Sequence, residues 1–141
     1  MLGWRRMAWI QTWVDVMARK AARSAVELKR LRPLYPGGPT AAQLRTEVEK
    51  QRRVPGIIFA NGPTGRRARI AGTGIEVFEV IGTYHAVGED RTNLAERYDW
   101  LTPEQLNAAL AYYTAFPDEI DQRLAEEEAL ERHYRAAHSA P

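Results

Sequence analysis

The stretch "ANGPTGRRARIAGTGIEVFEV", residues 60–80, decides the fold, because it passes from glycines and arginines into an apolar run. Asn61 and the glycines tolerate a positive φ, and Pro63 fixes a bend, so the first part is typical of a tight turn. The last part has apolar residues at helical spacing. The sequence therefore predicts a turn, a strand and a helix in close succession.

Two short strands are predicted on either side of the turn. The first runs over about 57–60, and in the second Arg67 and Arg69 alternate with Ala68 and Ile70. Alternation with a period of two is the signature of a strand that buries one face. We therefore expect a β-hairpin with one apolar and one cationic side.

The glycines of this stretch do not match a nucleotide-binding loop. A P-loop requires G-x-x-x-x-G-K-[S/T], whereas Gly62 and Gly65 are three residues apart and are followed by arginines. A dinucleotide-binding fingerprint requires a third glycine after G-x-G, which Gly72 and Gly74 lack. The stretch is interpreted as a basic hairpin that leads directly into a helix.

The remainder of the chain is predicted to be mainly α-helical. We expect helices over about 76–87 and 92–98, a third that begins at the Thr102 N-cap with Gln105 completing a capping box, and a last one over about 118–134. The apolar positions expected to face the core are Ile75, Phe78, Ile81 and Tyr84 in the first helix and Leu106, Leu110 and Tyr113 in the third. The first three helices predict a trihelical, helix-turn-helix-like unit.

The N-terminal part is predicted to form helices over about 4–31 and 40–52, joined by the linker "RPLYPGGPT". The chain is therefore expected to have three parts. They are a basic N-terminal helical extension over 1–53, a hairpin plus helix-turn-helix domain over 54–117, and an acidic amphipathic helix and tail over 118–141.

The charge is distributed unevenly along the 141 residues. Residues 1–56 carry 12 Lys/Arg and 4 Asp/Glu, whereas residues 57–141 carry 8 and 14, which together give the net charge of +2. Such an asymmetry indicates two different partners, or two copies that meet head to tail. The alternative is that the charges are simply scattered over solvated helices.

Several classes of function are excluded or disfavoured by the residues. There is no cysteine, so disulfides and thiolate metal sites are excluded, and no apolar stretch is long enough to span a bilayer. His133 and His138 are five apart and do not share a helix face, and no nucleophile motif or acid–base pair is present. We expect a cytoplasmic protein that is not an enzyme and that needs no metal and no cofactor.

The helix-turn-helix pattern makes DNA a candidate partner. In such a unit the N-terminal end of the third helix enters the major groove, where Thr102, Gln105 and Asn107 are the outward candidates. That helix has no lysine or arginine, so the cations for phosphate contacts are expected from Arg66, Arg67, Arg69 and Arg91. The alternative is a trihelical packing unit that does not contact a groove.

Three segments of the sequence resemble a known family. The segments "PGIIF", "GRRARIAGTGIEVFEVIGTY" and "LAERYDWLTPEQLNAALAYYTAFPDEID" are similar to the small helix-turn-helix proteins of the domain of unknown function numbered 433, which are similar to VapB-type antitoxins. The resemblance covers about residues 55–121. The matching positions in its second half are Tyr98, Leu101, Thr102, Glu104, Leu106, Ala109, Leu110 and Tyr112. Gly74 departs from the pattern, since many members have arginine there.

The resemblance implies an antitoxin that binds a PIN-like ribonuclease toxin and represses its own operon as a dimer. The last helix gives this a physical basis, because an acidic amphipathic helix complements the cationic groove of a ribonuclease. The apolar residues expected to bind the partner are Phe116, Ile120, Leu124, Leu130 and Tyr134. Alternatively, this stripe packs on the protein's own core or on a second copy.

A structural adaptor is the second hypothesis. Trp4, Trp9 and Trp13 lie beside arginines in the N-terminal segment, which suits a helix that docks on a larger assembly or an anionic membrane face. For an antitoxin, membrane binding is not expected.

Overall fold

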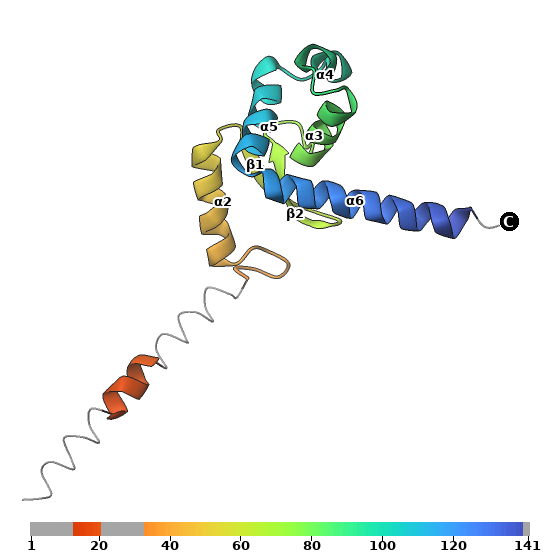
Figure 1. The fold of residues 1–141 in the computed structure, drawn as a ribbon. Helices are drawn as coiled ribbons and strands as arrows, with labels where there is room; N and C mark the ends of the chain where they lie inside the picture. Colours follow the sequence, from red (N-terminus) through yellow and green to blue (C-terminus); the bar gives the residue numbers. More distant parts are fainter. Residues whose placement is uncertain (1–12, 21–32, 140–141) are drawn as a thin grey trace, which may run out of the picture. The chain divides into compact units, whose positions relative to one another are not determined.

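The computed structural model describes residues 13–20 and 33–139, in two compact units, Met1–Glu47 and Val48–Pro141. Residues 13–20 form a helical segment (Figure 1), as predicted for this part of the N-terminal helix. The other residues of the predicted 4–31 helix, among them Trp4 and Trp9, lie outside the described residues. None of the helices in the described ranges is both long and apolar enough to cross a bilayer.

Helix α2, Ala41–Arg53, begins where the sequence predicts. The Thr40 N–H donates to Gln43 Oε1 at 2.9 Å, and the Gln43 N–H donates to Thr40 Oγ1 at 3.1 Å. These two bonds form a capping box, which satisfies two backbone donors that a helix otherwise leaves without a partner.

The second unit begins with the predicted hairpin. Strand β1, Ile57–Gly62, pairs antiparallel with β2, Gly65–Ile70, and the register runs from Ile57 opposite Ile70 to Gly62 opposite Gly65. Ala68 and Ile70 are buried, so one face of β2 packs on the core as predicted. Arg67 and Arg69 lie on the other face.

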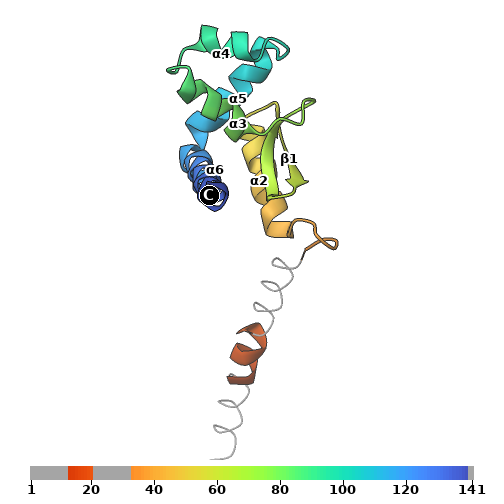
Figure 2. The same ribbon diagram turned by 90° about the vertical axis from the view of Figure 1, so that its right-hand side faces the viewer.

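Four helices follow, α3 (Val77–Ala86), α4 (Arg91–Arg97), α5 (Pro103–Ala115) and α6 (Pro117–His138). The described part of the chain is thus mainly helical with one two-stranded hairpin, which confirms the predicted fold class. The hairpin packs against α3 and α5, and the first part of α6 lies beside both helices, while its second part extends beyond them (Figures 1 and 2).

Each of the later helices begins at a signal that the sequence contains. Asp90 caps α4 by accepting from the N–H groups of Thr92 and Asn93 at 2.8 and 3.0 Å. Thr102 and Gln105 form the predicted capping box of α5. Proline is well tolerated in the first turn of a helix, which is the place it has in α5 and in α6.

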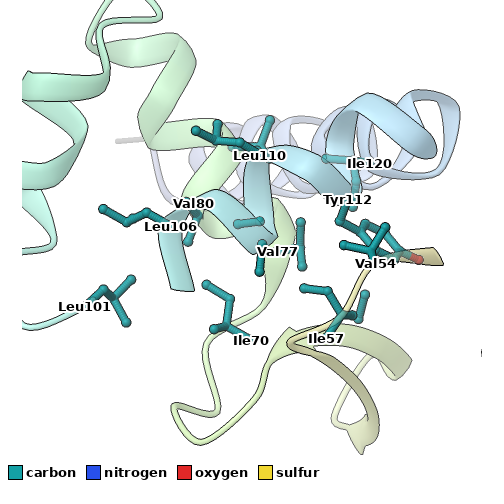
Figure 3. Packing of buried hydrophobic residues seen from close by; sticks show 14 of the residues in the cluster. Val54, Ile57, Ile70, Val77, Val80, Leu101, Leu106, Leu110, Tyr112 and Ile120 are labelled. Atoms are coloured by element: carbon teal, nitrogen blue, oxygen red, sulfur yellow. The ribbon is translucent and has the colours of Figure 1, made fainter. Parts of the chain in front are cut away.

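The hydrophobic core joins the hairpin, α3, α4, α5 and the beginning of α6 (Figure 3). Its largest fully buried side chains are Tyr112, Ile70, Ile81, Leu94, Val77 and Val80. The predicted core left out three fully buried positions, Val77 and Val80 in α3 and Tyr112 in α5. The predicted positions Ile75, Phe78, Tyr84 and Tyr113 are half-buried and pack against this core.

The physical reason is that α3 is covered on more than one side. It packs against β2, α5 and α6, so its apolar face is wider than the single three-to-four-residue stripe that periodicity indicates.

Candidate functional site

Two of the three hairpin arginines point along the loop between the strands. Arg66 Nη1 donates to Asn61 Oδ1 at 3.3 Å, and Arg67 Nη2 donates to the Thr64 carbonyl at 3.1 Å. Arg67 Nη2 also lies 3.6 Å from Glu126 Oε2 of α6. The cationic face of the hairpin is therefore in part neutralised by the acidic helix.

Arg69 holds the turn between β2 and α3. Its Nη1 donates to the Gly74 carbonyl at 2.7 Å, and its Nη2 lies 3.4 Å from Glu76 Oε1. Gly72 and Gly74 adopt φ values of 77° and 71°, which residues with a Cβ rarely adopt. Arg69 thus has a structural role at this turn.

Sequence reasoning missed Arg123, which is buried between the hairpin, α3 and α6. Its guanidinium carbon lies 4.2 Å from the ring centroid of Phe78, and its Nη1 donates to Glu127 Oε2 at 2.7 Å. Nη2 reaches Thr64 Oγ1 at 3.4 Å. The sequence contains one signal for this burial, because Arg123 stands between Ile120 and Leu124 in the predicted apolar stripe of the last helix.

Glu79 lies on α3 at the edge of this charged cluster. Partial burial raises the pKa of its carboxyl above the ordinary value, and the carboxylate of Glu76 raises it further. The guanidinium groups of Arg69 and Arg123 act in the opposite direction and lower the pKa. The net direction is upward, so the ionised form of Glu79 is disfavoured in the folded protein.

A second group of polar contacts joins Glu119, at the start of α6, to Tyr112 and Lys50. Glu119 Oε2 accepts from Tyr112 Oη at 2.8 Å and from Lys50 Nζ at 2.7 Å. The Lys50 ammonium lies 4.9 Å from the Phe116 ring centroid, and the Arg53 guanidinium carbon lies 5.4 Å from it. Phe116 is thereby covered by two cations of the chain itself.

Four of the predicted DNA-facing residues lie at α4 and the start of α5, whereas the three hairpin arginines lie on β2. Arg91 Nη1 donates to Asn107 Oδ1 at 3.4 Å, so these two candidates are neighbours. Thr102 Oγ1 accepts from the Gln105 N–H, and Gln105 Oε1 accepts from the Thr102 N–H. A base contact by Gln105 would therefore have to use its amide nitrogen while the capping box is intact.

The predicted partner-binding stripe of α6 divides into two parts. Ile120 is buried in the core, and Phe116 and Leu124 are half-buried against it. Leu130 and Tyr134 are 58% and 62% exposed, and every residue from 128 to 139 is exposed. The first part of the stripe therefore packs on the chain's own core, in agreement with the alternative interpretation, and its end is open to solvent.

Among residues 13–20 and 33–139, no three His, Asp or Glu side chains converge on a position that could hold a metal ion. His85 Nε2 lies 3.8 Å from Glu89 Oε1, at the exposed end of α3.

Comparisons with known proteins identify the family of this chain. Residues 60–113 match the model of the family described as "Protein of unknown function (DUF433)". A DUF433 member from Anabaena variabilis, with a crystal structure at 2.00 Å resolution, is 32% identical over 60% of this chain and 81% of its own. The chain belongs to the DUF433 family.

The structural superposition with the Anabaena protein has a TM-score of 0.43. A comparison with curated proteins gives no match. The matched segment of this DUF433 chain runs from the end of β1 to α5, so it contains the hairpin arginines, Arg91 and Asn107. Leu130 and Tyr134 lie outside it, on the part of α6 that is exposed.

Proposed function

We propose that this DUF433 protein is an antitoxin-like regulator that binds a PIN-like ribonuclease toxin and represses its own operon. In this proposal it acts in the cytoplasm as a non-enzymatic homodimer and needs no cofactor. The observation that carries the proposal is the exposed end of α6, where the large apolar side chains of Leu130 and Tyr134 are open to solvent on an otherwise charged helix.

The exposed end of α6 has the features of a helix that binds in a groove. Leu130 and Tyr134 are four residues apart and therefore share one face, and Glu126, Glu128 and Glu131 lie around them. A groove that binds RNA must be cationic, so these carboxylates would complement it and speed association. Large exposed apolar residues on an otherwise charged helix are typical of a binding surface.

The experiment is to purify the tagged full chain from its own host and to identify co-purifying proteins by mass spectrometry. A stoichiometric small ribonuclease supports the proposal. The double variant Leu130→Asp with Tyr134→Asp should lose that protein, because it places charges where apolar anchors are expected. The matched control, Ala129→Asp with Ala136→Asp, adds the same charge to other positions of this exposed helix and should retain it.

DNA binding is the second half of the proposal and has its own support. The hairpin supplies Arg66 and Arg67, which are half-buried, and the start of α4 supplies Arg91, which is exposed. Arg66→Gln with Arg67→Gln should reduce the slope of log K against log salt by about 0.9 for each phosphate that these side chains neutralise. Arg69 is retained in this variant because it holds the turn at Gly74.

A charge-matched control makes that measurement specific. Arg97→Gln with Arg132→Gln removes two exposed arginines away from the hairpin. If both double variants change the salt slope equally, the hairpin does not bind DNA specifically and only the overall charge matters.

The adaptor hypothesis is supported by one observation. In the helical segment 13–20, Trp13, Val14, Val16 and Met17 are 57%, 46%, 43% and 46% exposed, and Arg19 and Lys20 follow them. Such a segment suits an interfacial helix. Flotation of the full chain with anionic liposomes distinguishes the two hypotheses, because an antitoxin should remain in the unbound fraction.

A further inference from the structure

A hydrophobic pocket of about 200 Å³ lies between α4 and α5. Its apolar walls are formed by Leu94, Ala95, Leu101, Pro103, Leu106 and Leu110. Leu101, Leu106 and Leu110 also belong to the core cluster (Figure 3), so the pocket lies directly on the core. An open apolar concavity in a protein surface is the usual form of a small-molecule site.

Two polar side chains complete the lining, Arg91 and Asn107. The hydrogen bond between them is long, at 3.4 Å, which is near the limit for such a bond. Within the described part of the chain, Arg91 forms no ion pair with a carboxylate. A guanidinium without a carboxylate partner beside an apolar cavity is suited to bind a carboxylate from elsewhere.

We propose that this pocket binds a small free carboxylate with an apolar body, such as one aromatic ring on a short chain. The ring would replace water against the leucine walls, and the carboxylate would accept two parallel hydrogen bonds from Arg91. Asn107 would exchange its bond to Arg91 for a bond from its amide nitrogen to the ligand. An apolar cavity of about 150 Å³ suffices for benzene, so a volume of this size accommodates a ring and a short side chain.

The inference does not depend on the proposed toxin or DNA binding, because the site is complete in a single chain and is tested without either partner. A ligand of this size has few atoms, so its affinity is expected to be weak, with a Kd on the order of 1 mM.

The test is a titration of the ¹⁵N-labelled full chain with phenylacetate, followed by amide shifts in NMR spectra. We expect saturable shifts confined to α4 and the N-terminal half of α5. Phenylacetamide, which has the same shape without the charge, should bind about tenfold more weakly, because it does not form the charge-assisted pair with Arg91. Absence of saturable shifts with phenylacetate, or equal binding of both compounds, would overturn the proposal.

Two variants with matched controls locate the site. Ala95→Phe should fill the pocket and abolish binding, whereas Ala111→Phe, at an exposed position of α5 outside the pocket, should leave the Kd unchanged. Arg91→Gln should weaken phenylacetate to the level of phenylacetamide, whereas Arg97→Gln on the same helix should not. The dispersion of the amide spectrum reports that each variant is folded. Unchanged binding by folded Ala95→Phe would place the ligand elsewhere and contradict the inference.

Discussion

At the scale of single residues, Glu126 contacts one arginine of the cationic hairpin. Its carboxylate lies 3.6 Å from Arg67 Nη2, in a pair that is exposed in part. DNA phosphate and Glu126 would compete for the same guanidinium, so α6 reduces the positive potential of the hairpin. The proposed toxin-binding helix and the proposed DNA-binding hairpin are thereby linked through one ion pair.

Glu126→Gln should therefore strengthen duplex binding. Exposed ion pairs contribute at most about 1 kcal/mol, so the expected gain is roughly twofold to fivefold at low salt. Fluorescence anisotropy with a labelled duplex measures it. Glu131→Gln removes the same charge further along α6, and an equal gain in that control would mean that net charge alone is responsible.

Glu79 makes a prediction about pH. Because its pKa is raised in the folded state, the stability that its protonation contributes is fully present below the ordinary value of 4.5 and is lost as the pH rises through the higher folded-state pKa. The ionised form at neutral pH is therefore a small cost, which Glu79→Gln removes.

Glu79→Gln should be more stable than the parent at pH 7, by less than about 1 kcal/mol after allowance for its solvent exposure. The difference should shrink toward pH 4, where the parent carboxyl is protonated. Urea unfolding at both pH values measures this, with the exposed Glu128→Gln as the control. A gain that is the same at both pH values would contradict the assigned cause.

At the scale of elements, the helix starts are set by local side chains. The α5 capping box joins Thr102 and Gln105 through bonds of 2.9 and 3.1 Å. Thr102→Ala should lower the free energy of unfolding by about 1 kcal/mol, the usual cost of losing an N-cap. Thr92→Ala, at an exposed position inside α4, should not lower it, because alanine is the better helix former. If both variants are destabilised equally in urea unfolding, the cap is not the cause.

These local signals explain which parts of the fold the sequence could predict. Caps at Thr40 and Thr102 and the alternation in β2 depend on residues a few positions apart, and the corresponding elements begin close to the predicted positions. The burial of Val80 and Tyr112 depends on α3 and α5 being covered from several sides. Periodicity within one helix contains no information about how many neighbours that helix has.

The candidate site residues likewise depend on neighbours that a local sequence pattern does not reveal. Leu130 and Tyr134 could be named from their spacing, and they are exposed. Phe116 has the same chemistry, but Lys50 and Arg53, more than sixty positions earlier, cover its ring. The acidic run of α6 looks like a solvated face in the sequence, yet Glu126 pairs with Arg67 of β2. Pairings between distant segments cannot be derived from local patterns.

At the scale of the whole molecule, the structural core and the positive charge lie in different parts of the chain. All residues of the hydrophobic core cluster lie between Val54 and Ile120. Residues 1–38 carry 8 Lys/Arg and 2 Asp/Glu, so their removal changes the net charge from +2 to −4. The remainder, 39–141, keeps α2 with its capping box and every member of the core.

Deletion of residues 1–38 should therefore separate stability from nucleic-acid binding. We expect the free energy of unfolding to change little, because residues 39–141 contain every member of the core cluster. Duplex affinity should fall, because a chain with net negative charge is repelled by phosphate, and the salt slope should decrease by about 0.9 for each phosphate that the deleted residues neutralise. Urea unfolding and duplex titrations at several salt concentrations measure the two quantities on the same preparations. An unchanged salt slope would mean that residues 39–141 bind every phosphate. The hairpin arginines and Arg91 would then have to bind phosphate although carboxylate and amide groups of the chain already contact these side chains.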